Sequence, residues 1–134
     1  MKKLIFTFVT LFGLFAVTPA LAAEDNTVFE LRIYTTHPDK MPDLMARFRN
    51  HTTKLFERHG MENIGYWLPT EQKDGDKLYY ILKHKSREAA AASWKAFIAD
   101  PEWIKVRADS EANGAIVAGI ESVFMKSVDF SAIK

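Results

Sequence analysis

Three polar residues alternate along a short segment near the start of the chain: Glu30, Arg32 and Tyr34. Residues two apart on a β-strand project from the same face, so an acid, a base and a phenol would lie together. Arginine and carboxylate match in shape and charge. One interpretation is a polar pocket in which Arg32 holds an anionic or carbonyl group that Glu30 orients. The other, which we favour, is a structural ion pair.

Two histidines are the next residues with chemical potential. His51 and His59 are eight residues apart, more than two helical turns, so they cannot bind one metal ion as histidines four residues apart do. His51 falls at the edge of a predicted apolar stripe. It could act as a general base or hydrogen-bond donor at the edge of a cavity, or it could be an interior histidine with satisfied hydrogen bonds. We expect His59 to bond the last carbonyls of its helix, and His37 and His84 to be solvated.

The chain is also rich in tryptophan and tyrosine, which bury a large area while keeping one polar group. Most of them are expected in the core or at an interface, and some in the wall of an apolar pocket. Trp67 and Tyr79 are the two we assign to such a pocket. The predicted pocket thus comprises Glu30, Arg32, Tyr34, His51, Trp67 and Tyr79, with no catalytic residue assigned among them.

Several chemistries are absent from the sequence. The chain of 134 residues has no cysteine, which excludes disulfides, thiolate nucleophiles and zinc–thiolate sites. It has no glycine-rich phosphate loop, no serine nucleophile elbow and no closely spaced pair of metal-binding residues, so we predict neither a cofactor nor a metal. A net charge of +1 gives no general attraction to nucleic acid.

The first 22 residues have the order of a secretory signal peptide. Lys2 and Lys3 precede the apolar run 4–17, and Pro19 and an Ala-Leu-Ala triplet follow it. The run is too short for a transmembrane anchor. We predict cleavage after Ala22 or Ala23, and a mature domain over residues 23–134 in the periplasm or the medium, without a membrane anchor. Its 112 residues hold 16 basic and 17 acidic side chains.

The mature part predicts four strands and two helical units, the second a helix pair, that must position these residues. Strands are expected at 28–35, 64–68, 77–84 and 115–128, with helices from Met41 to Gly60 and over 87–99, and a further helical piece from Pro101 to about Ala112. Asp74-Gly75 predicts a hairpin turn, and Ser86 and Asp100 predict helix N-caps. The order is β-α-β-β-α-β, which predicts a ferredoxin-like α+β fold.

A four-stranded sheet has two faces, and the helices of this order cover one. We expect Phe29, Leu31 and Ile33 to face the core. The uncovered face would then carry some of Val28, Tyr34, Trp67, Tyr79, Ile81 and the last strand. Because so much apolar surface is unfavourable in water, we predict a homodimer that pairs these faces.

Several segments together resemble the NIPSNAP family. They are Glu30-Leu31-Arg32-Ile33-Tyr34, His51 with Leu55-Phe56 and His59-Gly60-Met61, Gly65-Tyr66-Trp67, and Trp94 through Asp100-Pro101-Glu102-Trp103. The resemblance covers residues 27–130 and implies a dimeric α+β barrel with the Glu30–Arg32–Tyr34 face inward. It supplies no reaction. Relatives by fold include cofactor-free monooxygenases and haem-degrading enzymes, so haem ligation by His51 stays open.

Two functions follow for an exported domain of this kind. The first is binding of a small apolar or aromatic molecule in the barrel cavity, with catalysis left undecided. The alternative is a non-catalytic dimeric module with a structural or partner-binding role. A cavity of at least roughly 300 Å³ between sheet and helices, with Arg32 and His51 converging on it, would favour the first.

Overall fold

The computed structural model describes residues 25–71 and 76–134. The predicted signal peptide and the predicted turn at Asp74-Gly75 lie outside these ranges. Among the described helices, none combines the length and apolarity needed to cross a bilayer.

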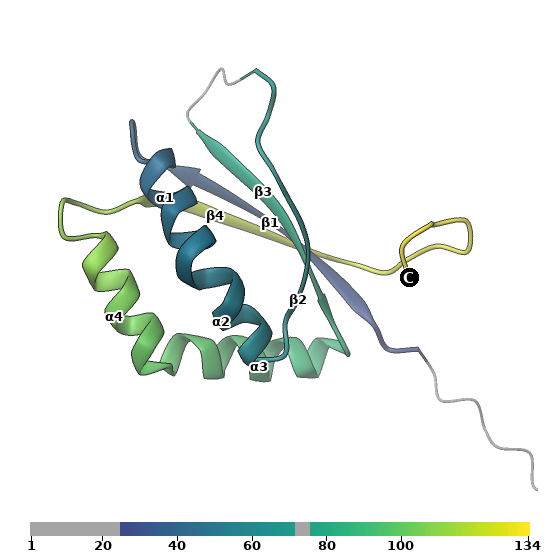
Figure 1. Ribbon diagram of the computed structural model, residues 1–134. Helices are drawn as coiled ribbons and strands as arrows, with labels where there is room; N and C mark the ends of the chain where they lie inside the picture. The colour runs from purple at the N-terminus through teal and green to yellow at the C-terminus, as the bar shows by residue number, and fades with distance from the viewer. Residues whose placement is uncertain (1–24, 72–75) are drawn as a thin grey trace, which may run out of the picture.

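Four strands form one antiparallel sheet: β1 (Val28–Thr36), β2 (Glu62–Trp67), β3 (Lys77–His84) and β4 (Val117–Met125). Their order is β2-β3-β1-β4, so β1 and β3 are central and β4 is an edge strand (Figure 1). This arrangement confirms the predicted ferredoxin-like α+β fold. The predicted last strand was longer at both ends than β4, and β2 begins two residues earlier than expected.

The first helical rod has three consecutive parts: α1 (Met41–Arg47), a π-helical turn η1 (Phe48–Thr52) and α2 (Thr53–Arg58). Gly60 follows with φ of 77°, a conformation that favours glycine and ends the helix as predicted. The apolar stripe of the sequence is buried, with Leu44, Leu55 and Phe56 fully inside.

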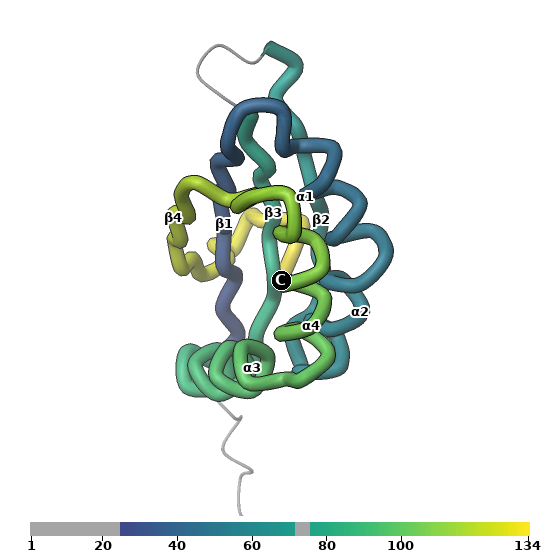
Figure 2. The backbone as a smooth tube through the Cα atoms, turned by 90° about the vertical axis from the view of Figure 1, so that its left-hand side faces the viewer, coloured from purple at the N-terminus to yellow at the C-terminus, as the bar shows by residue number. Residues whose placement is uncertain are grey.

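A second helical pair, α3 (Arg87–Ala99) and α4 (Pro101–Ser110), follows β3. The Ser86 side chain accepts a hydrogen bond from the Ala89 amide, and the Asp100 carboxylate accepts one from the Glu102 amide. Both N-caps are thus confirmed, because each satisfies an amide that the first helical turn leaves free. In Figure 2 α1 and α2 run beside β2, and α3 lies below the ends of the strands.

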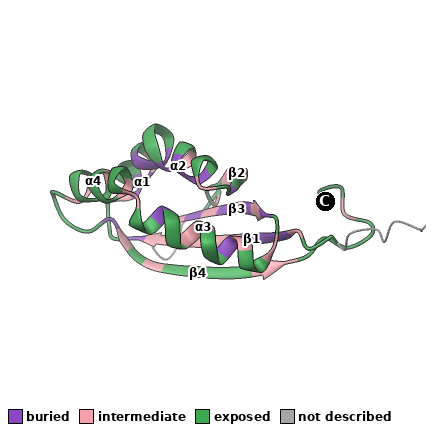
Figure 3. Ribbon diagram, turned by 90° about the horizontal axis from the view of Figure 1, so that it is seen from below, coloured by how far each residue is buried: buried purple, intermediate pink, exposed green. Residues whose placement is uncertain are grey.

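The core lies between the helices and one face of the sheet. Figure 3 shows buried residues, in purple, along β3 and on parts of α2 and α3. Its members are Met41, Leu44, Phe48, Leu55, Phe56, Met61, Leu78, Tyr80, Leu82, Phe97 and Ile116. Removal of their apolar area from water is the main favourable contribution to folding.

The strand register reverses the expected faces of β1. Glu30, Arg32 and Tyr34 lie opposite the buried Leu82, Tyr80 and Leu78 of β3. Because paired residues of antiparallel strands share a face, this polar set points to the helices. The expectation that Phe29, Leu31 and Ile33 face the helical core is wrong. They lie on the other face, opposite Lys83, Ile81 and Tyr79 of β3.

That other face, which we call the open face, is not covered by any helix of residues 25–71 and 76–134. Trp67, Tyr79 and Ile81 lie on it as predicted, whereas Val28 and Tyr34 do not. Trp67 is 52% exposed and Val123, opposite Leu31, is 50% exposed. The sheet therefore carries a half-exposed apolar surface opposite its helical layer.

Candidate functional site

Glu30 is the centre of a buried hydrogen-bond network although it is a charged residue. Its Oε1 atom accepts from Arg32 Nη1 at 2.7 Å and from Ser122 Oγ at 2.8 Å. Its Oε2 atom accepts from Trp94 Nε1 at 2.7 Å and contacts His84 Nε2 at 3.0 Å. Three strands and α3 thus converge on one carboxylate that is 1% exposed.

These donors decide the charge of Glu30. Burial by itself raises the pKa of a carboxyl group, but the hydrogen bonds from His84, Trp94, Arg32 and Ser122 outweigh it and lower the Glu30 pKa to about 2. The group is therefore a carboxylate at neutral pH and only accepts hydrogen bonds. His84 must consequently donate through Nε2.

Arg32 is held between this carboxylate and two aromatic rings. Its guanidinium carbon lies 4.1 Å from the ring centroid of Trp94 and 5.5 Å from that of Tyr34. Burial disfavours the charged form, but Tyr80, Tyr34 and Glu30 raise the Arg32 pKa above its usual value. The Nε atom of Arg32 is buried and has no hydrogen-bond partner among the described residues.

A cleft of about 500 Å³ opens in front of Arg32, between β1, β4 and the α3–α4 pair. We call it the helix–sheet cleft. Its wall combines aromatic and apolar side chains with three guanidinium groups and one carboxylate; the side chains concerned are Arg32, Tyr34, Arg47, Trp94, Phe97, Ile98, Trp103, Arg107, Glu111, Val117 and Ile120. Its size is within the range of small-molecule sites.

Arg47 is a second cation of this cleft and, unlike the partly exposed Arg32, is buried. Its side chain is 3% exposed, and its Nη1 atom donates to Ser110 Oγ at 3.3 Å and to Glu111 Oε1 at 3.2 Å. The guanidinium lies over the ring of Trp103 at 5.4 Å. No local pattern predicts its burial, which arises because α4 packs against the flank of α1.

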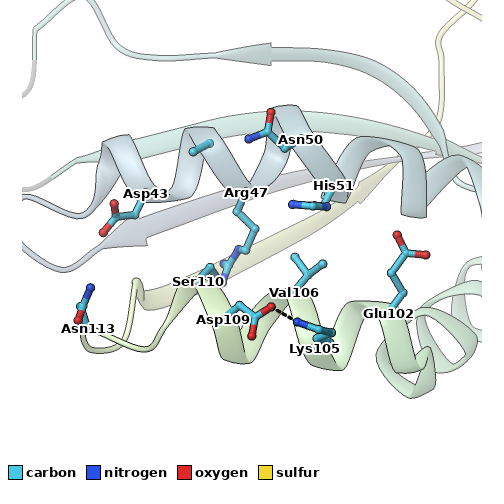
Figure 4. A pocket seen from close by; sticks show the side chains of 11 residues that line it. Asp43, Arg47, Asn50, His51, Glu102, Lys105, Val106, Asp109, Ser110 and Asn113 are labelled. Atoms are coloured by element: carbon cyan, nitrogen blue, oxygen red, sulfur yellow. Dashed lines mark hydrogen bonds and ion pairs between the residues drawn. The ribbon is translucent and has the colours of Figure 1, made fainter.

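His51 lies in a different place. It lines a polar cleft of about 560 Å³ between the first helical rod and α4, together with Asn50, Asp43, Lys105 and Asp109. Figure 4 shows His51 and Asn50 on the rod, and Arg47 extending from it toward Ser110. His51 is exposed, so the interior interpretation is wrong. The π-helical turn adds a residue within η1, and the regular helical projection used for His51 does not apply there.

The predicted pocket is therefore divided among three places. Glu30, Arg32 and Tyr34 lie together at the helix–sheet cleft or directly behind it. Trp67 and Tyr79 lie on the open face, and His51 lies in the polar cleft. The helix–sheet cleft exceeds the expected volume of roughly 300 Å³. Arg32 lines this cleft as expected, but His51 does not.

Two further histidines differ from expectation. His84 is buried and bonds Glu30 instead of being solvated. The sequence contained a signal for it, because His84 continues the alternation of Leu78, Tyr80 and Leu82. His59 Nε2 contacts Asp100 Oδ2 at 2.7 Å, and so ties the end of α2 to the N-cap of α4 instead of bonding the last carbonyls. Residues 25–71 and 76–134 contain no cluster of three metal-binding side chains.

A family model described as NIPSNAP matches residues 29–132, nearly the whole described chain. The chain belongs to the NIPSNAP family. The resemblance seen in the sequence is thereby confirmed. None of the curated proteins matches the chain.

Solved structures of other NIPSNAP proteins share the fold. A NIPSNAP family protein of unknown function from Agrobacterium tumefaciens has a TM-score of 0.70 at 19% identity, over 83% of this chain and 96% of that one. An uncharacterized NIPSNAP-like domain protein from Burkholderia xenovorans has a TM-score of 0.68 at 17% identity, over 80% and 90%. SnoaB, a cofactor-independent oxygenase from Streptomyces nogalater, has a TM-score of 0.52 at 14% identity, over 81% and 99%.

Proposed function

We propose that this NIPSNAP domain binds a small apolar or aromatic molecule in the helix–sheet cleft. The observation that carries the proposal is the cleft itself, whose volume of about 500 Å³ suits a small molecule. Trp94, Phe97 and Trp103 form an aromatic wall, with ring centroids 5.6 Å apart for Trp94–Phe97 and 4.5 Å apart for Phe97–Trp103. Such rings supply a large contact area for a flat apolar ligand.

The Glu30 network supports binding by keeping the back of the cleft rigid. Arg32 is fixed by an ion pair to Glu30 and by contact with Trp94, which in turn bonds Glu30. A site whose side chains are already ordered loses less entropy when a ligand binds.

We also propose that the domain acts outside the cytoplasm and as a homodimer. The N-terminal segment 1–22 has the features of an export signal. Trp67 and Val123 lie half-exposed on the open face. Pairing two such faces would remove this apolar area from water. The cleft, on the other side of the sheet, would stay accessible in such a dimer.

Ligand binding can be tested by native mass spectrometry of protein purified from the cell envelope, followed by calorimetric titration with a panel of small aromatic compounds. We expect a retained small molecule or saturable binding of at least one compound. Ile98 lines the cleft and Ile104 does not, although both are largely exposed. Ile98→Ser should weaken binding several-fold, and Ile104→Ser should leave it unchanged.

Absence of both a retained molecule and any binding across the panel would contradict the proposal. Such a result, with a dimer observed, would favour the non-catalytic dimeric module instead. Equal effects of Ile98→Ser and Ile104→Ser would place the ligand elsewhere.

A further inference from the structure

We infer that the ligand of the helix–sheet cleft is a monoanion, an aromatic carboxylate, whose charged group is received by Arg47 and Arg107. This inference rests on the proposed binding function and specifies the class of ligand. It assigns the anion to the α4 end of the cleft, in contrast to the sequence-based hypothesis that Arg32 holds it.

Arg32 is already neutralised. Its Nη1 atom lies 2.7 Å from Oε1 of the buried Glu30, and its guanidinium carbon lies 4.1 Å from the ring centroid of Trp94. An incoming carboxylate at Arg32 would also approach the Glu30 carboxylate, which carries a full charge at neutral pH. Like charges at close range in a poorly hydrated site repel strongly.

At the α4 end the balance of charge is different. Arg47 and Arg107 share a single carboxylate, Glu111, with Arg47 Nη1 3.2 Å from Oε1 and Arg107 Nε 3.3 Å from Oε2. The charged groups that line the cleft, together with Glu30 behind it, are three guanidiniums and two carboxylates. One positive charge is left uncompensated among these described side chains, and a single negative charge on a ligand would balance it.

An unpaired donor is found at the same end. The Nε atom of Arg47 is buried and has no hydrogen-bond partner among the described residues, while its side chain is 3% exposed. A buried donor without an acceptor costs free energy that an acceptor would recover. A carboxylate is the acceptor that a guanidinium binds best, because two N–H groups can donate to its two oxygens.

The aromatic part of the ligand follows from the neighbours of this cation. Arg47 lies over Trp103, whose ring is 4.5 Å from Phe97. A ligand with its carboxylate at Arg47 would therefore place its apolar body along these rings. The charge and the aromatic surface lie next to each other, as a compact aromatic acid requires.

The test compares two compounds of the same shape, 2-naphthoate and 2-naphthamide, by isothermal titration calorimetry with the full mature chain at neutral pH. We expect the naphthoate to bind at least about tenfold more tightly, with an affinity that falls as salt is added. Arg107→Gln should remove most of this preference. Arg107 is the appropriate site for this change because its side chain is 63% exposed, so its loss should not unfold the domain.

Glu111→Gln should change the affinity for naphthoate in the opposite direction from Arg107→Gln. Removing the carboxylate that both arginines share should strengthen naphthoate binding several-fold and leave naphthamide binding unchanged. Arg49→Gln is the matched control, because Arg49 is exposed and lies outside the cleft. It should affect neither compound.

The outcomes separate this inference from the proposed function. Equal binding of naphthoate and naphthamide, insensitive to Arg107→Gln and Glu111→Gln, would overturn the monoanion and leave the aromatic site in place. Failure of both compounds, and of the wider panel, to bind would overturn the proposed function itself. A preference for naphthoate that Arg107→Gln does not reduce would place the anion elsewhere and also overturn the inference.

Discussion

The guanidinium of Arg32 lies 4.1 Å from the ring centroid of Trp94, and the indole N–H of Trp94 donates to the carboxylate that Arg32 also binds. Glu30, Arg32 and Trp94 thus form a closed triangle in which each pair is in contact. Because Trp94 belongs to α3 and the other two to β1, the triangle joins helix to sheet. It also forms the back of the helix–sheet cleft.

The Trp94 indole hydrogen bond should be measurable on its own. Trp94→Phe keeps an aromatic ring but removes the donor to Glu30, and hydrogen bonds to charged groups contribute about 1.5–3 kcal/mol. We expect a loss of this size in the free energy of unfolding, measured in urea. Trp103→Phe is the control, since no hydrogen bond of its indole is found among the described residues. Equal losses for the two variants would mean that ring size, and not the hydrogen bond, matters.

Glu30→Gln should destabilise the protein strongly at neutral pH. The variant leaves Arg32 buried without its carboxylate, and breaking a buried ion pair in this way costs about 3–5 kcal/mol. The loss should appear as a lower urea midpoint at pH 7. An effect below about 1 kcal/mol would show that the network is not a source of stability.

The lowered pKa of Glu30 also predicts that the free energy of unfolding decreases as the solution becomes acidic. The Glu30 pKa is lowered from 4.5 to about 2 in the folded protein, so between these values the unfolded chain binds more protons than the folded one. Its contribution to stability is present above about pH 4.5 and is lost as pH falls toward 2. The stability difference between wild type and Glu30→Gln, measured by urea unfolding from pH 7 to 2, should therefore shrink over that interval. A difference that stays constant with pH would contradict the assignment.

Local signals in the sequence predicted most elements of the fold. The caps at Ser86 and Asp100, the glycine at position 60 and the alternation of β3 each act within a few residues, and each is confirmed. The faces of β1 were not predictable in this way. Apolar side chains occur at both its odd and even positions, so periodicity alone does not select the buried face.

Which face of β1 points to the helices is decided by contacts between residues that are distant in sequence. Glu30 faces the helices because His84, Trp94 and Ser122 all donate to it from other elements, at separations of 54, 64 and 92 residues. Only the register of β1 with β3 and β4 brings these donors together. Arg47 is a comparable case, since its partners Ser110 and Glu111 lie at the end of α4.

Processing of the N-terminal segment is a further prediction. If residues 1–22 are an export signal, the protein recovered from the cell envelope should begin at Ala23 or Glu24, because the small-residue triplet ending at Ala22 suits signal peptidase. N-terminal sequencing or intact-mass measurement would show this. A variant with Ala20→Asp and Ala22→Asp should accumulate uncleaved. Recovery of the unprocessed wild-type chain from the cytoplasm would contradict export.

The open face gives the last prediction, that the domain is a dimer whose contact includes Val123. Val123 lies opposite Leu31 on this face and is 50% exposed. Val123→Lys would place an ammonium group within the contact, where loss of its hydration is not repaid. We expect wild type to sediment as a dimer and Val123→Lys to raise the dimer dissociation constant at least about tenfold, since one buried unpaired charge costs more than the 1.4 kcal/mol that a factor of ten represents. Ile104→Lys is the matched control, because Ile104 is 56% exposed but lies on α4, away from the open face.

A monomeric wild type would refute the dimer. A dimer that Ile104→Lys disrupts and Val123→Lys does not would instead place the dimer contact on the helices and not on the sheet.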